Sequence, residues 1–154
     1  MIKKYYKPLF AVILTFAGLS VQAQTDEEAV RKTINNMFEG MKNSDTALIR
    51  SAFSSGAILQ TIGRNKEGKT MVRTDAVDSF IVSIAKPHTD VYDERISFET
   101  IKIDGDLAIA WTPYKFYVGE KFSHCGVNSF QLVELNGTWK IQYLIDTRRR
   151  QGCE

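Results

Sequence analysis

Histidine is the side chain best suited to acid–base chemistry near neutral pH, and this chain of 154 residues has two, His88 and His124. His88 follows Pro87 in a predicted loop, whereas His124 lies inside a long aromatic stretch predicted to form strands. Asn128 stands four residues after His124, so a strand would place both side chains on one face. We expect His124 or Asn128 to hydrogen-bond a bound molecule, and His124 to be the catalytic group if a reaction occurs.

Two tight turns fix a provisional register for the stretch from Trp111 to Arg150. Gly119-Glu120 and Asn136-Gly137 predict three long antiparallel strands, with His124 opposite Lys115. The aromatic-rich face is predicted to bury against helices and to line a pocket, although core packing explains its aromatic members equally well. A slip of one residue would transfer every side chain to the other face. The predicted ligand-binding residues are Trp111, Lys115, Tyr117, His124, Asn128, Phe130 and Tyr143, together with Phe38 and Met41 from an N-terminal helix.

An acid–base pair would require a carboxylate beside His124. In the predicted register Asp146 points to the opposite face, and Asp93 and Glu94 precede the strand that begins at Arg95. The sequence therefore favours binding over catalysis as the role of His124.

Other chemistries lack their required context. Residues Gly63–Thr70 match the phosphate-loop pattern G-x-x-x-x-G-K-T, but the next helix signal comes later, at Thr74-Asp75. A charged hairpin turn between strands at 57–62 and 69–73 is the plainer interpretation. With two histidines and no His, Cys and carboxylate cluster at metal-site spacing, neither a metal nor another cofactor is expected.

The first 23 residues have the features of a signal peptide. Lysines precede the apolar run Leu9–Leu19, and Val21 and Ala23 suit signal peptidase, which predicts a mature chain from Gln24. The run is short for a membrane span of about 20 residues, although an uncleaved anchor is the alternative. Removing three lysines leaves 17 basic (20 minus 3) against 18 acidic residues, a balance that does not favour nucleic-acid binding. We expect a periplasmic or secreted protein without a stable membrane span.

The chain has two cysteines, Cys125 and Cys153. In an oxidising compartment a bridge between them would stabilise the fold by on the order of 3 kcal/mol. The tail would have to fold back to bring them together, so the spacing leaves the bridge undecided. The intervening run Arg148–Arg150 is interpreted as a solvated tail rather than an anion site.

The order of the predicted elements indicates an α+β fold in a single domain, residues 24–154. Thr25 is the predicted cap of a first helix, a short helix covers Thr46–Phe53, and a third ends by Lys86, before Pro87. Strands follow at 95–103 and 107–111. The outer sheet face, with Tyr114, Phe116 and Leu144 among its predicted residues, is too apolar for solvent, so we expect a homodimer through it.

Three short stretches support a resemblance to a known superfamily. They are Ser83–His88 (SIAKPH), the strand entry Asp93-Glu94-Arg95, and the turn Ile103–Asp106 (IDGD). With the element order, they resemble the putative lumazine-binding and SnoaL-like branch of the nuclear transport factor 2-like superfamily, over residues 26–147. The resemblance implies three helices packed on a strongly bent mixed sheet that forms a cone, the cystatin-like roll. The superfamily includes ketosteroid isomerases, polyketide cyclases, dehydratases and binding modules, among which the fold does not choose.

The hypothesis favoured by the sequence is an exported dimer that binds a small apolar or aromatic molecule without transforming it. The second is an isomerase, cyclase or dehydratase that uses His124 as its acid–base group. The third is a structural or partner-binding module whose own aromatic side chains fill the pocket.

Overall fold

The computed structural model describes residues 17–153, with side chains from residue 25 onward. Two helices, two strands and a third helix come first, and the described chain from Tyr92 onward contributes strands alone. The helices are α1 (Ala17–Lys42), α2 (Thr46–Ala52) and α3 (Val77–Ala85). The strands are β1 (Phe53–Arg64), β2 (Thr70–Ala76), β3 (Tyr92–Ile96), β4 (Thr100–Asp104), β5 (Leu107–Val118), β6 (Lys121–Glu134) and β7 (Trp139–Thr147).

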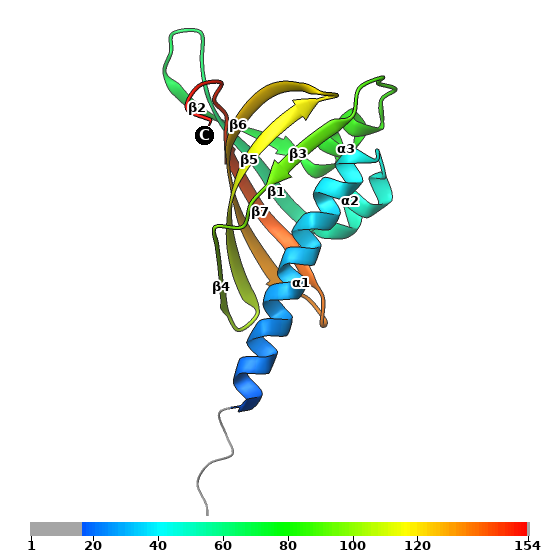
Figure 1. Cartoon of the computed structure of the whole chain (residues 1–154), viewed down its shortest axis with the longest axis vertical. Helices are drawn as coiled ribbons and strands as arrows, with labels where there is room; N and C mark the ends of the chain where they lie inside the picture. The colour runs from blue at the N-terminus through cyan, green and yellow to red at the C-terminus, as the bar shows by residue number, and fades with distance from the viewer. Residues whose placement is uncertain (1–16, 154) are drawn as a thin grey trace, which may run out of the picture.

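The seven strands of the described chain form one bent sheet in the order β2-β1-β7-β6-β5-β3, with β4 also paired to β5. The β1–β7 pair is parallel and the other pairs are antiparallel. Figure 1 shows the three helices on the concave side of this sheet, with α1 running along the open side of the curve. The predicted α+β cone is confirmed.

Helix α1 begins earlier than the sequence predicts. Thr25 is not a helix start, because the backbone is already helical from Ala17 and no proline interrupts residues 17–25. Residues 1–16, which include the basic start of the predicted signal peptide and most of its apolar run, lie outside the described residues. From Val30 to Met41 the predicted apolar stripe is buried against the sheet.

The other boundaries follow from local chemistry. Asp45 caps α2, its side chain accepting from the Leu48 amide at 2.9 Å. Helix α3 starts at Val77 rather than at Thr74-Asp75, because those residues pair with β1 as part of β2. The single strand predicted at 95–103 is two strands. The pairing with β5 breaks opposite Pro113, which has no N–H to donate.

The predicted register of the last three strands is wrong beyond one bulge in each hairpin. Both hairpins start as predicted, with Val118 opposite Lys121 and Glu134 opposite Trp139. A bulge then leaves Ser123 unpaired in β6 and shifts His124 from Lys115 to Phe116. A second bulge at Gln142 in β7 shifts Phe130 from Tyr143 to Leu144.

Each bulge shifts the pairing by one residue. The side chains of β5 and of the second half of β7 therefore point to the opposite faces from those predicted. Tyr114, Phe116 and Leu144 therefore face the helices rather than the outside, and Asp146 joins them. Trp111 and Tyr117 move to the outer face instead, where Trp111 is 45% exposed.

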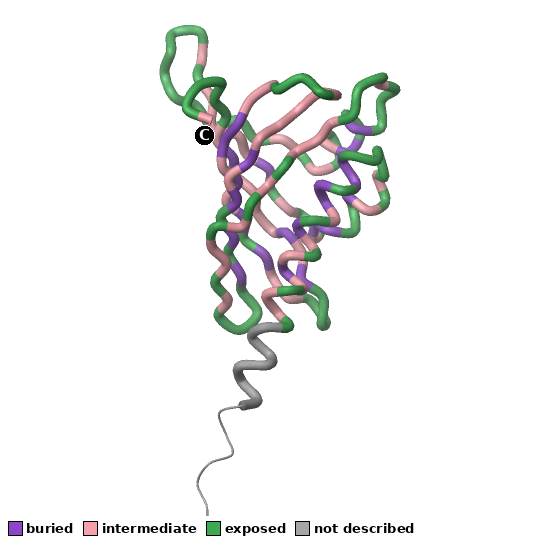
Figure 2. Tube along the Cα trace, viewed as in Figure 1, coloured by how far each residue is buried: buried purple, intermediate pink, exposed green. Residues whose placement is uncertain are grey.

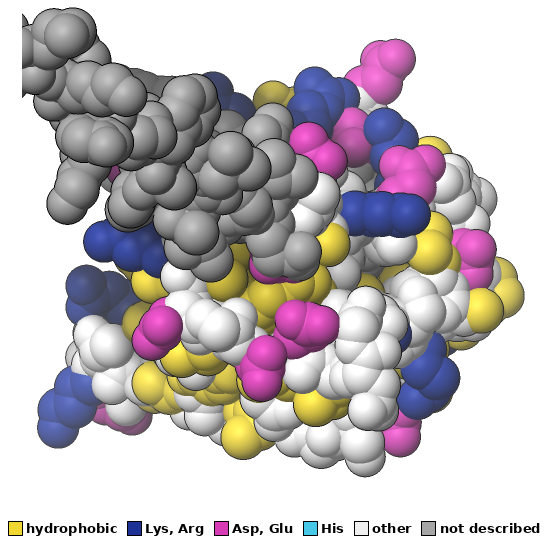
Figure 3. Space-filling model, turned by 90° about the horizontal axis from the view of Figure 1, so that it is seen from below, with side chains coloured by type: hydrophobic (Ala, Val, Ile, Leu, Met, Phe, Trp, Pro, Cys, Tyr) yellow, Lys and Arg dark blue, Asp and Glu magenta, His cyan; other side chains and the backbone are white. Residues whose placement is uncertain are grey.

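The core occupies the closed end of the cone. Buried residues concentrate on the facing sides of α1 and the central strands (Figure 2), where Phe38 meets Phe130 edge-on at 6.2 Å. Seen from this end, hydrophobic side chains lie in the middle of the surface with acidic side chains among them, and basic side chains lie nearer its edge (Figure 3). Fully buried Val30, Ile34 and Ile141 anchor the packing of α1 against the sheet.

The segment that matches the phosphate-loop pattern can be assigned. It ends β1 and begins β2, and residues 65–69 form the charged turn between them, where Asn65 accepts hydrogen bonds from the Glu67 and Lys69 amides. No helix in the described part of the chain is both long and apolar enough to cross a membrane.

Candidate functional site

A cavity of about 420 Å³ lies between the helices and the concave face of the sheet, toward its open end. Its size suits a small organic molecule. One side is apolar, from the second half of α1, α3 and the sheet. The other side carries carboxyl, amide, imidazole and guanidinium groups. The apolar lining residues are Met37, Phe38, Met41, Leu59, Phe80, Ile84, Tyr92, Phe116 and Leu144, and the polar ones include Arg73, Asp75, Glu94, His124, Asn128, Asp146 and Arg148.

Glu94 of β3 is a carboxyl group of the lining with altered acidity. Its Oε1 accepts a hydrogen bond of 2.8 Å from Nδ2 of Asn128, and its other oxygen has no hydrogen-bond partner among the described residues. Burial raises the pKa of Glu94 to about 7, and the negative charge of Asp146 adds to the rise against the opposing bond from Asn128. Glu94 therefore exchanges its proton near neutral pH.

Asp146 sits beside this pair, and its charge is compensated. Its Oδ2 accepts from Tyr114 Oη at 3.1 Å and from Arg148 Nε at 2.8 Å. Burial raises the pKa of Tyr114 far above its usual range, with the neighbouring Asp146 charge acting in the same direction. Tyr114 therefore remains a neutral hydrogen-bond donor. The hydroxyl of Thr112, beside Asn128 on the same face, is buried without a partner among the described residues.

His124 lies between aromatic rings at the edge of the polar side. Its ring centroid is 4.9 Å from that of Phe116 and 5.7 Å from that of Tyr114, and Nδ1 lies 3.1 Å from Ser123 Oγ. Burial lowers the pKa of His124, as do the positive charges of Arg148 and Arg150, against the charge of Asp146. His124 is therefore neutral at pH 7.

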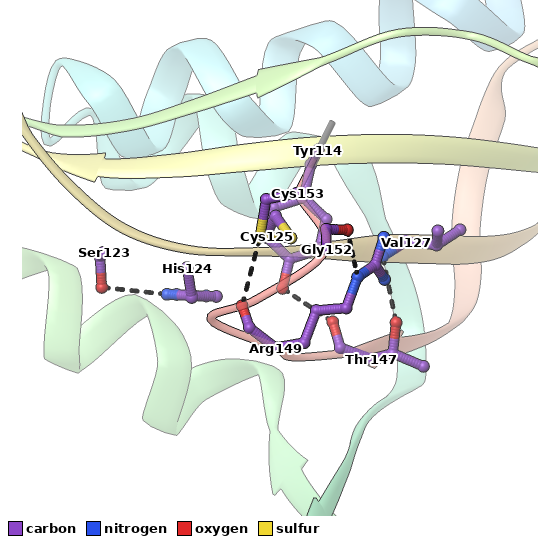
Figure 4. The surroundings of a disulfide bond; sticks show 9 residues. All are labelled: Tyr114, Ser123, His124, Cys125, Val127, Thr147, Arg149, Gly152 and Cys153. Carbon is purple, nitrogen blue, oxygen red and sulfur yellow. Dashed lines mark hydrogen bonds between the residues drawn. A yellow bond between two sulfur atoms is a disulfide. The ribbon is translucent and has the colours of Figure 1, made fainter.

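A disulfide joins Cys125 to Cys153 and fixes the chain end beside His124 (Figure 4). The tail folds back after β7, and Arg149 exchanges two backbone hydrogen bonds with Cys125, of 2.8 and 2.9 Å. Gly126 allows the close approach, because a Cβ there would lie 1.8 Å from the Thr147 carbonyl oxygen. Arg148 is thus held at the cavity wall, not in a freely solvated tail.

The predicted site residues divide into two groups. His124, Asn128, Phe38 and Met41 line the cavity, and Phe130 lies in the core behind it. Trp111, Lys115, Tyr117 and Tyr143 do not line it, because the two bulges place them on the outer face. The Tyr117 ring packs under Arg95 at 4.1 Å, and Tyr143 Oη bonds Gln60 at 2.6 Å.

Glu94 and Asp146 are the functional residues that sequence reasoning missed. The side chain of Asp146 points to the inner face only because of the bulge at Gln142. Glu94 lies in a strand that starts three residues earlier than predicted. The strand entry Asp93-Glu94-Arg95 was visible as a motif. Side chains alternate between the two faces along β3, so Glu94 lines the cavity and Asp93 does not. Asp93 instead bonds Lys42 and Arg95 outside the cavity.

A bent α+β cone with a polar-ended cavity defines a domain of the nuclear transport factor 2-like class, as the resemblance predicts. The chain belongs to the family described as "Putative lumazine-binding", whose pattern matches residues 25–143. No curated protein matches the sequence.

Solved structures share the fold at low sequence identity. A protein of unknown function from Mycobacterium tuberculosis has a TM-score of 0.70 at 12% identity, covering 90% of this chain and 80% of that one. A nuclear transport factor 2-like protein with a cystatin-like fold from Novosphingobium aromaticivorans has a TM-score of 0.69 at 10% identity, covering 90% and 92%. Another from Shewanella baltica, also of unknown function, has a TM-score of 0.63 at 17% identity, covering 83% and 97%. At these identities the likeness concerns the fold alone.

Proposed function

We propose that this protein is an exported domain that binds a small, partly apolar molecule in the cavity between its helices and its sheet. The observation that carries the proposal is a cavity of about 420 Å³ with apolar walls on one side and hydrogen-bonding groups on the other. Binding sites for small molecules combine these two features, burial for affinity and a few polar groups for orientation. Membership of a family described as lumazine-binding supports the same function.

Export is part of the proposal. It is supported by the basic and apolar pattern of the first 23 residues and by the disulfide between Cys125 and Cys153, since disulfides persist in oxidising compartments. Expression with the native N-terminus and N-terminal sequencing of the exported form should give a first residue of Gln24. Retention of Met1 in a cytoplasmic product would contradict it.

The binding proposal is tested with flat aromatic fragments in ¹H–¹⁵N NMR titrations. Ser83 is exposed at the cavity lining on α3, so Ser83→Trp fills the cavity without disturbing the core. Val82, 59% exposed and outside the lining, provides the matched control Val82→Trp. Saturable shifts at lining residues that disappear in Ser83→Trp alone support cavity binding. Shifts that persist in both variants place the fragments elsewhere and contradict it.

A homodimer through the outer sheet face completes the proposal. Leu107, Ile109 and Trp111 alternate along this face of β5 and are 48%, 42% and 45% exposed. Covering such a row with a second copy removes apolar surface from water. Trp111→Glu should convert a dimer to a monomer in analytical ultracentrifugation, whereas Val82→Glu, on α3, should not. A wild-type protein that sediments as a monomer at micromolar concentration contradicts this part.

One observation favours an enzyme as the second candidate. Two carboxyl groups, Asp146 and Glu94, line the cavity together with His124, and the pKa of Glu94, about 7, suits proton transfer at neutral pH. Glu94 rather than His124 is then the base, taking a proton from a carbon next to a carbonyl and returning it to the resulting enolate. Deuterium exchange into 2-tetralone in D₂O tests this function. Exchange above the buffer rate that is lost in Glu94→Gln supports it, and exchange at the buffer rate contradicts it.

A further inference from the structure

The charges around the cavity are paired with one exception. Arg148 bonds Asp146 at 2.8 Å, and Arg73 bonds Asp75 at 2.9 Å, so two of the lining acids already have a cation. Glu94 has a neutral partner only, the amide of Asn128. Outside the lining, Lys42 of α1 is engaged by Asp93, which also bonds Arg95. Glu94 is therefore the one carboxyl of the described lining without an ion-pair partner.

Two carboxyl oxygens at this end of the cavity are open acceptors. The second oxygen of Glu94 and Oδ1 of Asp146 have no partner among the described residues. Tyr114 Oη donates to Asp146 and to the Thr147 carbonyl, and Arg148 donates from Nε to Asp146 and from one Nη to Thr61. An anionic ligand here would face two carboxyl groups, whereas a ligand with N–H donors would satisfy both open oxygens.

The apolar wall of the cavity, opposite these carboxyl groups, determines the shape of the part of the ligand that it contacts. Phe38 and Met41 from α1, Phe80 and Ile84 from α3, and Phe116 from β5 surround it with apolar and aromatic surface. Such walls favour a flat apolar body, and no charged residue of α1 or α3 belongs to the lining.

We propose that the cavity takes a flat aromatic monocation bearing two N–H donors on one edge, such as an amidine or a protonated amino-heterocycle, with Glu94 as its counter-ion. The cationic edge lies against Glu94 and the open oxygen of Asp146, and the ring lies between α1, α3 and Phe116. This inference rests on the proposed binding function, which it deepens by naming the class of ligand.

The pH dependence follows from the groups that face Glu94. These are Asp146 and Arg148 from β7 and its extension, Tyr114 from β5, His124 from β6, Tyr92 of its own strand, and the Arg73–Asp75 pair of β2. Only the carboxylate form of Glu94 attracts the cation. Because its pKa is about 7, affinity should be about tenfold lower at pH 6 than at pH 8. Protonation of His124 at low pH acts in the same direction, since it adds a positive charge nearby.

The experiment compares benzamidine, benzamide, benzoate and indole by NMR titration at pH 6 and pH 8. Benzamidine should bind most tightly, benzoate least, and only benzamidine should weaken about tenfold at the lower pH. Glu94→Gln keeps an acceptor for Asn128 but loses the charge. It should therefore reduce benzamidine affinity at pH 8 more than tenfold and leave indole unchanged.

The outcomes separate this inference from the function on which it rests. Indole or benzoate binding in the cavity as tightly as benzamidine, with no rise in benzamidine affinity between pH 6 and pH 8, would overturn the cationic class and leave small-molecule binding intact. The wild-type pH series decides this even if Glu94→Gln folds poorly. Failure of every probe to shift the lining residues at millimolar concentration would overturn both.

Discussion

Asn128 of β6 donates a 2.8 Å hydrogen bond to Glu94 of β3, although these two strands are not neighbours in the sheet. Strand β5 lies between them, and the bond crosses above it on the concave side, at the polar end of the cavity. The amide therefore holds an otherwise uncompensated carboxyl at a fixed position facing the ligand space. This relationship has consequences for stability and for titration as well as for binding.

Replacing Glu94 should change how stability depends on pH. The folded protein holds the Glu94 proton up to about pH 7, whereas an unfolded chain releases it near 4.5. The folded state therefore binds more protons in this window, and the contribution of Glu94 to stability falls as pH rises from 4.5 to 7. Glu94→Gln removes this penalty and should stabilise the protein at pH 8 by up to about 3 kcal/mol, with little effect at pH 4. Urea denaturation at both pH values measures it, and an equal effect at both would contradict the assignment.

Removing the Asn128 amide should raise the pKa of Glu94 further, because the bond from Asn128 opposes the effect of burial. Asn128→Ala is compared with Ser129→Ala, the adjacent residue on the outer face. Carboxyl ¹³C NMR should show Glu94 titrating above 7 in the first variant and at the wild-type value in the second. A lower pKa of Glu94 in Asn128→Ala would be inconsistent with the bond.

Loss of the disulfide should destabilise the fold and alter the titration of His124. Breaking a closed loop of this length costs about 3 kcal/mol. It also frees the tail, so the Arg148 and Arg150 charges that help to lower the pKa of His124 move away. Cys153→Ser paired with Cys125→Ser should lower the denaturation midpoint and raise the pKa of His124 in a ¹H NMR titration. Wild-type protein treated with a thiol reductant is the control for side-chain effects. Unaltered His124 titration in both samples would show that the tail stays in place without the bridge.

The close approach of β7 to Gly126 predicts strong intolerance of a larger residue. A methyl group there must displace the Thr147 carbonyl, which also accepts from Tyr114 Oη at 2.9 Å. Gly126→Ala should cost at least about 2 kcal/mol in chemical denaturation, as overpacking a tight site does. Gly63→Ala, in a strand with open space around its Cβ position and no positive φ, is the matched control and should be nearly neutral. Comparable losses in both would point to backbone flexibility instead of crowding.

The sequence predicted most of the architecture because its signals are local. The apolar stripe from Val30 to Met41 and the turns at Gly119 and Asn136 each follow from a few neighbouring residues. The site depended on two bulges, and Ser123 and Gln142 carry no residue type that marks them. A single extra residue reverses the face of all that follows, so the sequence correctly identified His124 and Asn128 on β6 but exchanged Lys115 for Phe116 and Tyr143 for Leu144.

Glu94 shows a different limit. Its acidity depends on burial and on a partner 34 positions away, neither of which a local pattern encodes. Alternation of side chains would place Asp146 on the outer face only if β7 had no bulge.

Native mass spectrometry of the protein, expressed with its full sequence and gently purified, tests the central claim most directly. We expect the wild-type chain to carry an additional small-molecule mass. This mass should be retained in Val82→Trp and lost in Ser83→Trp, whose side chain fills the cavity. The mass of the polypeptide alone in all three proteins would contradict small-molecule binding and would favour the partner-binding interpretation of this domain.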